Sequence, residues 1–231
     1  MTEWHDLPRS EKEKTRLEPI DIGNGITCIN LGYGINLYRN AIPREQGKKI
    51  IETLESTLAD TSNNFEWHGA MVRDNEIIEE SRNCVDFKYK REHIDVNQPG
   101  AQGIIGIHKD VEDKLDLCLR HYESLWHLKM HYKEAFNFVK YNPGKYFKVH
   151  SDDGPYYTCT ISSVVYLNDD YEGGEIAYPR HDLVIKPEAG DILINPSTFV
   201  YEHASLEVKS GQKYAVVIMN DYNDMFHKEH S

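Results

Sequence analysis

The sequence predicts an α+β protein whose core is mainly β: a double-sheet jelly roll supported by N-terminal helices. Two observations carry this prediction. From about residue 136 onward, the chain consists of short apolar runs separated by turn signals such as Asn-Asp-Asp, Gly-Gly and Pro-Glu-Ala-Gly. Residues 110–136 instead place apolar side chains close to the 3.6-residue period of a long amphipathic helix. The length of 231 residues suits one domain with one core.

The N-terminal half is expected to begin with an arm, residues 1–24, because this stretch is highly charged and shows little periodicity. From Gly25 the pattern changes to apolar residues that alternate with small or polar ones between glycines, as in short strands. Residues 43–56 then place isoleucine and leucine at helical spacing directly after a proline. We therefore predict a strand pair that leads into a helix at the start of a single domain, residues 25–231.

Within this domain, residues from about 25 to 135 are expected to form the helical support. Residues from about 136 to 222 are expected to form the jelly-roll core, because many short strands at regular spacing are typical of that architecture. The strands of the core are expected at 158–167, 174–179, 182–187, 190–196, 199–204 and 213–221.

Charge and cysteine content narrow the function classes. With 38 acidic against 26 basic residues, the formal net charge is -12, and such a surface repels the phosphate backbone of nucleic acids. The four cysteines form no Cys-x-x-Cys pair, so neither a zinc knuckle nor a disulfide framework is indicated. No apolar run resembles a signal peptide or a membrane span. We therefore expect a cytoplasmic protein that binds neither nucleic acid nor membrane, and its oligomeric state stays open.

A candidate metal site begins with His150-Ser151-Asp152. Side chains two apart on a strand share a face, so His150 and Asp152 converge on one point, whereas Asp153 would need a bulged strand to do so. Alone, the motif fits a polar turn at a strand end better than a metal site, so a third ligand is needed. His203 lies 53 residues downstream on a later expected strand, and sheet pairing would bring it beside the first two. Two histidines and one carboxylate form the facial triad of non-haem Fe(II) oxygenases.

Lys213 adds a cation to this constellation. It lies ten residues after His203, at the start of the last expected strand, where it would hold the far carboxylate of an anionic cosubstrate. The alternative interpretation is a surface cation beside a turn. The spacing from His203 favours the functional interpretation.

These residues resemble the 2-oxoglutarate- and Fe(II)-dependent prolyl 4-hydroxylase family. The resemblance runs from about Gly25 to Asp221. It is carried by Tyr141-x-x-Gly144-x-Tyr146-x-x-x-His150-x-Asp152, by the stretches VVYLNDDYEGGEIAYP and KPEAGDILINP, and by His203 and Lys213. In that family, the catalytic core is a double-stranded β-helix, or jelly roll, flanked by helices. The resemblance therefore implies the same architecture that the strand pattern predicts.

The resemblance also implies roles for individual residues. The two histidines and the aspartate of the triad would bind Fe(II), and Lys213 would pair with the C5 carboxylate of 2-oxoglutarate. Tyr141 stands in the place of the family's hydroxyl donor to that carboxylate, and Ser162 in that of a second, smaller donor. O₂ would be the second cosubstrate and ascorbate the reductant, and no catalytic residue beyond the metal ligands is implied.

Substrate contacts are expected at three further residues. The stretch EESRNCVDFKY resembles the part of the family that faces the peptide channel, which would make Arg82 a substrate contact. Tyr156 and Tyr157 follow the metal motif closely and would line a channel able to stack on a proline ring. The alternatives are a solvated arginine before a strand and tyrosines that only fill the core.

The expected function is hydroxylation of prolyl residues in a peptide or protein, with release of succinate and CO₂. Two alternatives stay open at the level of sequence. One keeps this chemistry but acts on another side chain, a free amino acid or a small molecule. The other is a non-catalytic jelly-roll binding protein with a vestigial metal site.

Overall fold

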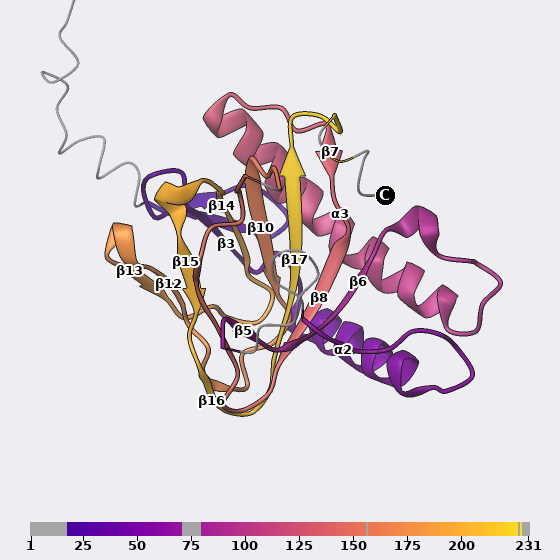
Figure 1. Ribbon diagram of the computed structural model, residues 1–231. Helices are drawn as coiled ribbons and strands as arrows, with labels where there is room; N and C mark the ends of the chain where they lie inside the picture. Colours follow the sequence, from indigo (N-terminus) through magenta and orange to yellow (C-terminus); the bar gives the residue numbers. More distant parts are fainter. Residues whose placement is uncertain (1–17, 71–79, 156, 226, 228–231) are drawn as a thin grey trace, which may run out of the picture.

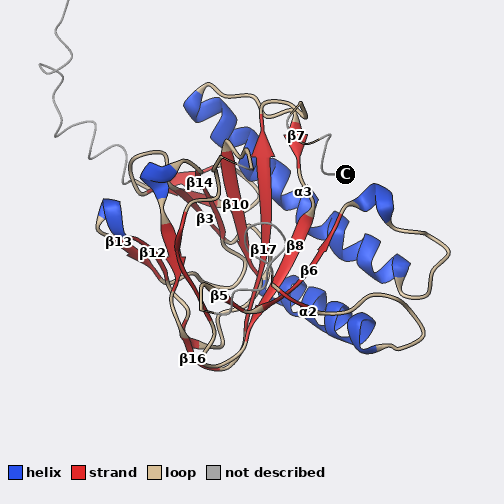
Figure 2. Cartoon of the chain, viewed as in Figure 1, coloured by secondary structure: helices blue, strands red, loops and turns tan. Residues whose placement is uncertain are grey.

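The computed structural model describes residues 18–70, 80–155, 157–225 and 227. Two long helices lie against one face of a large antiparallel sheet, and a smaller antiparallel sheet lies against its other face (Figures 1 and 2). The predicted α+β class with a mainly β core is confirmed. No helix in the described part of the chain is long and apolar enough to cross a membrane.

The described chain opens with a strand pair that leads into a helix, as predicted. The elements are β1 (Ile20–Asp21), β2 (Thr27–Asn30), β3 (Asn36–Arg39) and α2 (Arg44–Ala59). α2 starts directly after Pro43, whose fixed φ and missing N–H suit the start of a helix. β1 lies within the range expected as an arm, but it pairs with β2.

The second long helix, α3 (Ala101–Trp126), begins after Gly100 and ends at His127, both in the left-handed region. The expected bounds, 110–136, are wrong at both ends. At the start, Gly103 and Gly106 interrupt the helical spacing of apolar residues, so the sequence pattern does not reveal the first turns. One of them, Gly103, lies where an added Cβ would be 3.3 Å from threonine side chains of α2. At the end, the chain after His127 leaves the helix and joins the sheet, because strand pairing satisfies its backbone groups there.

The large sheet has ten strands in the order β1-β2-β3-β14-β10-β17-β8-β6-β4, with β7 also paired to β17. Its remaining strands are β4 (His68–Gly69), β6 (Val85–Tyr89), β7 (Tyr132–Lys133), β8 (Phe136–Tyr141), β10 (Ile161–Tyr166), β14 (Ile192–Pro196) and β17 (Lys213–Asp221). The strands β10 and β17 lie at its centre: every residue of β10 is buried, and so is every residue of β17 except the half-buried Val217 and Met219.

The small sheet has the order β13-β12-β15-β9-β5 and supplies the candidate metal ligands. Its strands are β5 (Arg82–Asn83), β9 (Tyr146–His150), β12 (Ile176–Tyr178), β13 (Leu183–Ile185) and β15 (His203–Ser205). A separate pair joins β11 (Glu172–Gly173) to β16 (Val208–Ser210), and short 3₁₀ turns are η2 (Arg91–His93), η3 (Pro179–His181) and η4 (Phe199–Tyr201). The strand expected at 199–204 thus begins only at His203, after η4.

Alternate residues of the central strands face different layers. Val165 and Val216 pack with the helices, whereas Val164 and Ala215 pack with the small sheet. This alternation follows from the two-residue period of a strand. The space between the two sheets therefore receives side chains from both, and the candidate site lies there.

Candidate metal centre and cosubstrate pocket

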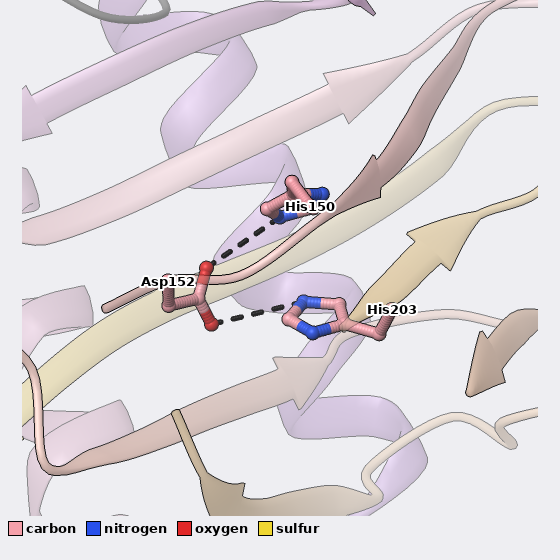
Figure 3. Close-up of side chains that lie close together, drawn as sticks. All are labelled: His150, Asp152 and His203. Atoms are coloured by element: carbon pink, nitrogen blue, oxygen red, sulfur yellow. Dashed lines mark ion pairs between the residues drawn. The ribbon is translucent and has the colours of Figure 1, made fainter. Parts of the chain in front are cut away.

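Three candidate ligands meet at one end of the small sheet. His150 is the last residue of β9, and its register partner across the sheet is His203, the first residue of β15. Asp152 follows two residues beyond β9. One ligand atom from each of the three residues lies within 4.8 Å of the others, and the side chains point toward one another (Figure 3). Within the described residues, no other group of three histidine, cysteine or acidic side chains meets this criterion.

Asp152 lies between the two imidazoles. Its Oδ1 is 3.5 Å from His150 Nε2, and its Oδ2 is 3.7 Å from His203 Nε2 (Figure 3). Asp153 lies elsewhere, because its Oδ1 accepts a hydrogen bond from the backbone N–H of Cys159 at 3.1 Å. The structure therefore brings Asp152, and not Asp153, to the histidines.

Both imidazoles are oriented through their other nitrogen. His150 Nδ1 is 2.8 Å from the carbonyl of Lys148, and His203 Nδ1 is 3.1 Å from the carbonyl of Tyr201. Since a carbonyl only accepts hydrogen bonds, each Nδ1 carries a proton, and the neutral form of each ring keeps its lone pair on Nε2. The ring of Phe147 stacks on His150 at 3.5 Å between centroids. Both Nε2 atoms are thus prepared to bind a metal.

The protonation states suit a cation. Burial alone would raise the pKa of Asp152, but the charges of His203 and His150, together with hydrogen bonds from His150 and Ser162, lower it below its usual range. Burial lowers the pKa of His203. An ionised Asp152 carboxylate and a His203 imidazole whose charged form is disfavoured are the states in which these groups bind a divalent metal.

Lys213 lies buried deeper in the same interior. Its side chain is 2% exposed, and its Nζ donates to the carbonyl of Gly174 at 2.8 Å and to Ser205 Oγ at 2.9 Å. Burial, with a contribution from Lys186, lowers the pKa of Lys213 to about 7. A buried cation without a carboxylate partner among these contacts is a site that favours an anion.

Tyr141 lies beside Lys213. The two residues are register partners of β8 and β17, and Lys213 Nζ is 5.3 Å from the Tyr141 ring centroid. Burial raises the pKa of Tyr141 well above its usual value, so the phenol keeps its proton and remains a donor. Ser205 completes this cluster and was missed by the sequence analysis. Its position two residues after His203 was the available signal, because such residues share a strand face.

Ser162 is not brought to this cluster. It lies opposite Met219 on β17, six residues from Lys213 along that strand, which separates their backbones by about 20 Å. Its hydroxyl instead lies 2.5 Å from Asp152 Oδ2. The strand register therefore places Ser162 beside the candidate ligand Asp152, whereas Lys213 lies six residues farther along β17.

The expected substrate contacts have different surroundings. Arg82 is not a solvated charge: its side chain is 13% exposed, pairs with Asp86 at 3.1 Å and lies 5.2 Å from the Phe147 ring centroid. It also lines a small hollow with residues of β4, β5 and β6 and of the turn between β8 and β9. Tyr157 is half-buried, with its ring edge-on to His227 at 5.9 Å. Tyr156 lies outside the described residues.

Comparison with known proteins places this geometry in a wider group. Residues 136–219 match the model of the 2OG-Fe(II) oxygenase superfamily. A PKHD-type hydroxylase of Crocosphaera subtropica (strain ATCC 51142 / BH68) is 24% identical over 188 residues, which cover 77% of this chain and 74% of that protein.

Solved structures agree in fold. A Trichoplax adhaerens prolyl hydroxylase in complex with a peptide fragment of the hypoxia inducible factor oxygen degradation domain has a TM-score of 0.66 at 14% identity, covering 86% of this chain and 87% of that one. The viral collagen prolyl hydroxylase of Paramecium Bursaria Chlorella virus-1, in its 2OG complex, has a TM-score of 0.58 at 19% identity, covering 82% and 96%. Both likenesses support the double-stranded β-helix architecture.

Fold, ligand cluster and family match together define a 2-oxoglutarate-dependent dioxygenase. The superfamily implies Fe(II), 2-oxoglutarate and O₂ as the groups that it uses. Solved structures that share this fold include prolyl hydroxylases. The alternative of a non-catalytic binding protein is thereby set aside.

Proposed function

We propose that this protein hydroxylates a prolyl residue in a peptide or protein and converts 2-oxoglutarate to succinate and CO₂. The observation that carries the proposal is the pairing of two sites in one interior: the His150–Asp152–His203 cluster and the buried Lys213. A 2-oxoglutarate molecule needs both, since one end chelates a metal and the other carries a carboxylate that a cation neutralises.

The donor set fits Fe(II). Two imidazole nitrogens and one carboxylate oxygen form the facial arrangement that leaves coordination positions open for substrate groups. When bound, Fe(II) supplies the activation of O₂ and the transfer of one oxygen atom to a C–H bond. We assign His150, Asp152 and His203 to hold it, with ascorbate as the reductant that keeps the metal in its ferrous state.

Lys213 and Tyr141 are assigned to the far end of 2-oxoglutarate. The ammonium of Lys213 would form a charge-assisted hydrogen bond to the C5 carboxylate, and the phenol of Tyr141 would donate a second hydrogen bond. Ser205, which already accepts a bond from Lys213, would orient the ammonium. Their burial excludes water from the carboxylate and strengthens these bonds.

The substrate class is the finer part of the proposal. The Trichoplax structure holds a peptide, which supports a peptide substrate here. We assign Arg82, Tyr156 and Tyr157 as candidate contacts. Arg82 lies on β5, whose register partner on β9 is Phe147, and Phe147 stacks on His150. A substrate that touches Arg82 would therefore be close to the metal.

The decisive experiment supplies the protein with Fe(II), 2-oxoglutarate and three substrates in parallel. These are a proline-rich peptide, the same peptide with every proline replaced by alanine, and free L-proline. Proline-rich segments are already ordered as polyproline II and bind aromatic surfaces at low entropic cost. We expect a mass gain of one oxygen in the first substrate only.

Succinate release alone is not a sufficient measurement, because 2-oxoglutarate can be decarboxylated without substrate. Oxygen incorporation must therefore be followed by mass in the substrate. Efficient hydroxylation of free proline, or equal incorporation into the proline-free peptide, would refute the prolyl peptide assignment. It would move the assignment to the same chemistry on another amino acid or small molecule.

A further inference from the structure

A chain of buried polar side chains runs from Asp152 to β14 and the loop before β10. Ser162 Oγ lies 2.5 Å from Asp152 Oδ2 and 2.8 Å from Ser197 Oγ, and Ser197 Oγ lies 3.1 Å from Cys159 Sγ. Ser162, Ser197 and Cys159 are at most 2% exposed. Neither the metal ligation nor the cosubstrate pocket described above uses these three side chains.

The hydrogen bonds that connect these side chains all run in one direction, toward Asp152. An ionised carboxylate only accepts hydrogen bonds, so Ser162 donates to Asp152 and must accept from Ser197. Ser197, whose one hydrogen points to Ser162, accepts from Cys159, whose Sγ also lies at the longer distance of 3.5 Å from the carbonyl oxygen of Ile161. Burial, reinforced by the charge of Asp152, raises the pKa of the Cys159 thiol to about 12, so the thiol keeps the proton that it donates. Hydrogen bonds aligned in this way strengthen one another.

Asp152 needs such an anchor more than the histidines do. His150 and His203 lie on paired strands and have backbone acceptors for their rings, whereas Asp152 lies beyond the end of β9. The bond from Ser162 ties this segment to β10 of the large sheet. It uses one lone pair of Oδ2, which also faces His203 Nε2 at 3.7 Å, and leaves Oδ1 without this bond, facing His150 Nε2 at 3.5 Å.

We propose that Ser162 is a positioning residue of the metal centre. Its hydroxyl, supported by Ser197 and Cys159, holds the Asp152 carboxylate so that one oxygen is presented to a divalent metal. This inference rests on the proposed function, because it takes Asp152 as a ligand. Hydrogen-bond partners of metal ligands typically contribute about 10- to 100-fold to metal affinity.

The chain offers a matched control in the next residue. Ser163 is as fully buried as Ser162, but its hydroxyl accepts a hydrogen bond from Asn220 Nδ2 at 3.0 Å, in the direction away from Asp152. Ser162→Ala and Ser163→Ala therefore remove the same atom from adjacent positions of one strand. Only the first removal touches the carboxylate.

The experiment measures Mn(II) affinity by calorimetric titration of the full chain, with unfolding curves for every variant. We expect Ser162→Ala to weaken Mn(II) binding about 10- to 100-fold and Ser163→Ala to leave it unchanged. Ser162→Thr keeps the hydroxyl and should restore most of the affinity. If Ser162→Ala does not fold, Ser197→Ala should show a smaller loss in the same direction, because it removes only the donor to Ser162.

The outcomes separate this inference from the proposed function. Tight Mn(II) binding by the wild type and an equal affinity in folded Ser162→Ala would overturn the positioning role alone. No Mn(II) binding by the wild type would overturn both. If Ser162→Ala keeps its Mn(II) affinity but has a raised KM for 2-oxoglutarate, Ser162 belongs to the cosubstrate pocket and the positioning role is overturned. The positioning role requires a weaker Mn(II) affinity and an unchanged KM.

Discussion

Each imidazole of the candidate triad donates its Nδ1 proton to a backbone carbonyl two residues earlier in the chain. The metal-facing nitrogen is thereby chosen by local backbone geometry, not by the metal. This arrangement is set before any ligand binds, which reduces the cost of organising the site. Loss of one imidazole leaves only two donors.

His203→Ala should therefore abolish Fe(II)-dependent turnover while the fold persists. His131→Ala, which truncates an exposed histidine outside the cluster, is the control and should keep full activity. Turnover is measured with ample Fe(II), and folding by circular dichroism. Wild-type rates in His203→Ala would remove this residue from the ligand set.

Lys213→Ala should raise the apparent KM for 2-oxoglutarate about tenfold or more, because a charge-assisted hydrogen bond contributes about 1.5–3 kcal/mol. Oxaloacetate should replace 2-oxoglutarate poorly, since it is one methylene too short to span the metal and the lysine. The KM for the peptide substrate should change little. An unchanged KM for 2-oxoglutarate would mean that another cation binds it.

The pH dependence follows from the low pKa of Lys213, about 7 in the ligand-free protein because of burial. Above that pH the amine is neutral, so binding the carboxylate must also take up a proton. The KM for 2-oxoglutarate should be flat below pH 7 and rise with pH above it, by at most tenfold per unit. Lys213→Arg, which stays charged, should remove this rise; an equal rise in both proteins would exclude Lys213 as its source.

At the scale of elements, the contact between α2 and α3 depends on small residues. Gly103 of α3 lies where an added Cβ would be 3.3 Å from Thr53 Cγ2 and Thr57 Oγ1, whereas a Cβ on Gly106 would meet no heavy atom within 4 Å. The two glycines lie one turn apart in the same helix. Alanine substitutions at these two positions therefore distinguish the entropic cost of glycine in a helix from the close helix packing that glycine permits.

Gly106→Ala should raise the free energy of unfolding by about 0.5–1 kcal/mol, because alanine loses less backbone entropy in a helix. Gly103→Ala should gain less, or lose stability, because its methyl group presses on the threonines of α2. Denaturant unfolding of both variants measures the difference. Equal gains would show that the helices adjust freely at this contact.

At the scale of the whole molecule, the candidate site joins parts of the chain that are distant in sequence. His150 and His203 come from paired strands, and Asp152 is held by a residue of the other sheet. A metal bound there would link these segments in the folded state only. Metal binding is therefore expected to stabilise the fold.

Mn(II) at 100 times its Kd should stabilise the protein by about 2.7 kcal/mol. For a chain of this length, that corresponds to a rise in Tm of about 5–10 °C. Chelation with EDTA should reverse the shift, and Asp152→Ala should not show it. A shift of the same size in Asp152→Ala would indicate metal binding elsewhere.

Much of the fold was predictable because it is encoded in local patterns. The strand pair before α2 and most core strands follow from alternation and turn residues, which act over a few positions. The bounds of α3 were not predictable from local patterns. Gly103 is accommodated in the helix because it allows a close contact with α2, and the residues after His127 leave the helix because they pair with strands of the sheet. Both causes lie outside the segment.

The sequence by itself determined the chemistry of the candidate site: the residue types and the spacing of His150, Asp152, His203 and Lys213. Only the tertiary structure decided which side chains meet. Strand register brings Ser205 to Lys213 and directs Ser162 to Asp152. The pairing of strands depends on interactions between residues far apart in sequence, across the whole core. The contacts of Ser205 with Lys213 and of Ser162 with Asp152 therefore cannot be predicted from the local sequence pattern.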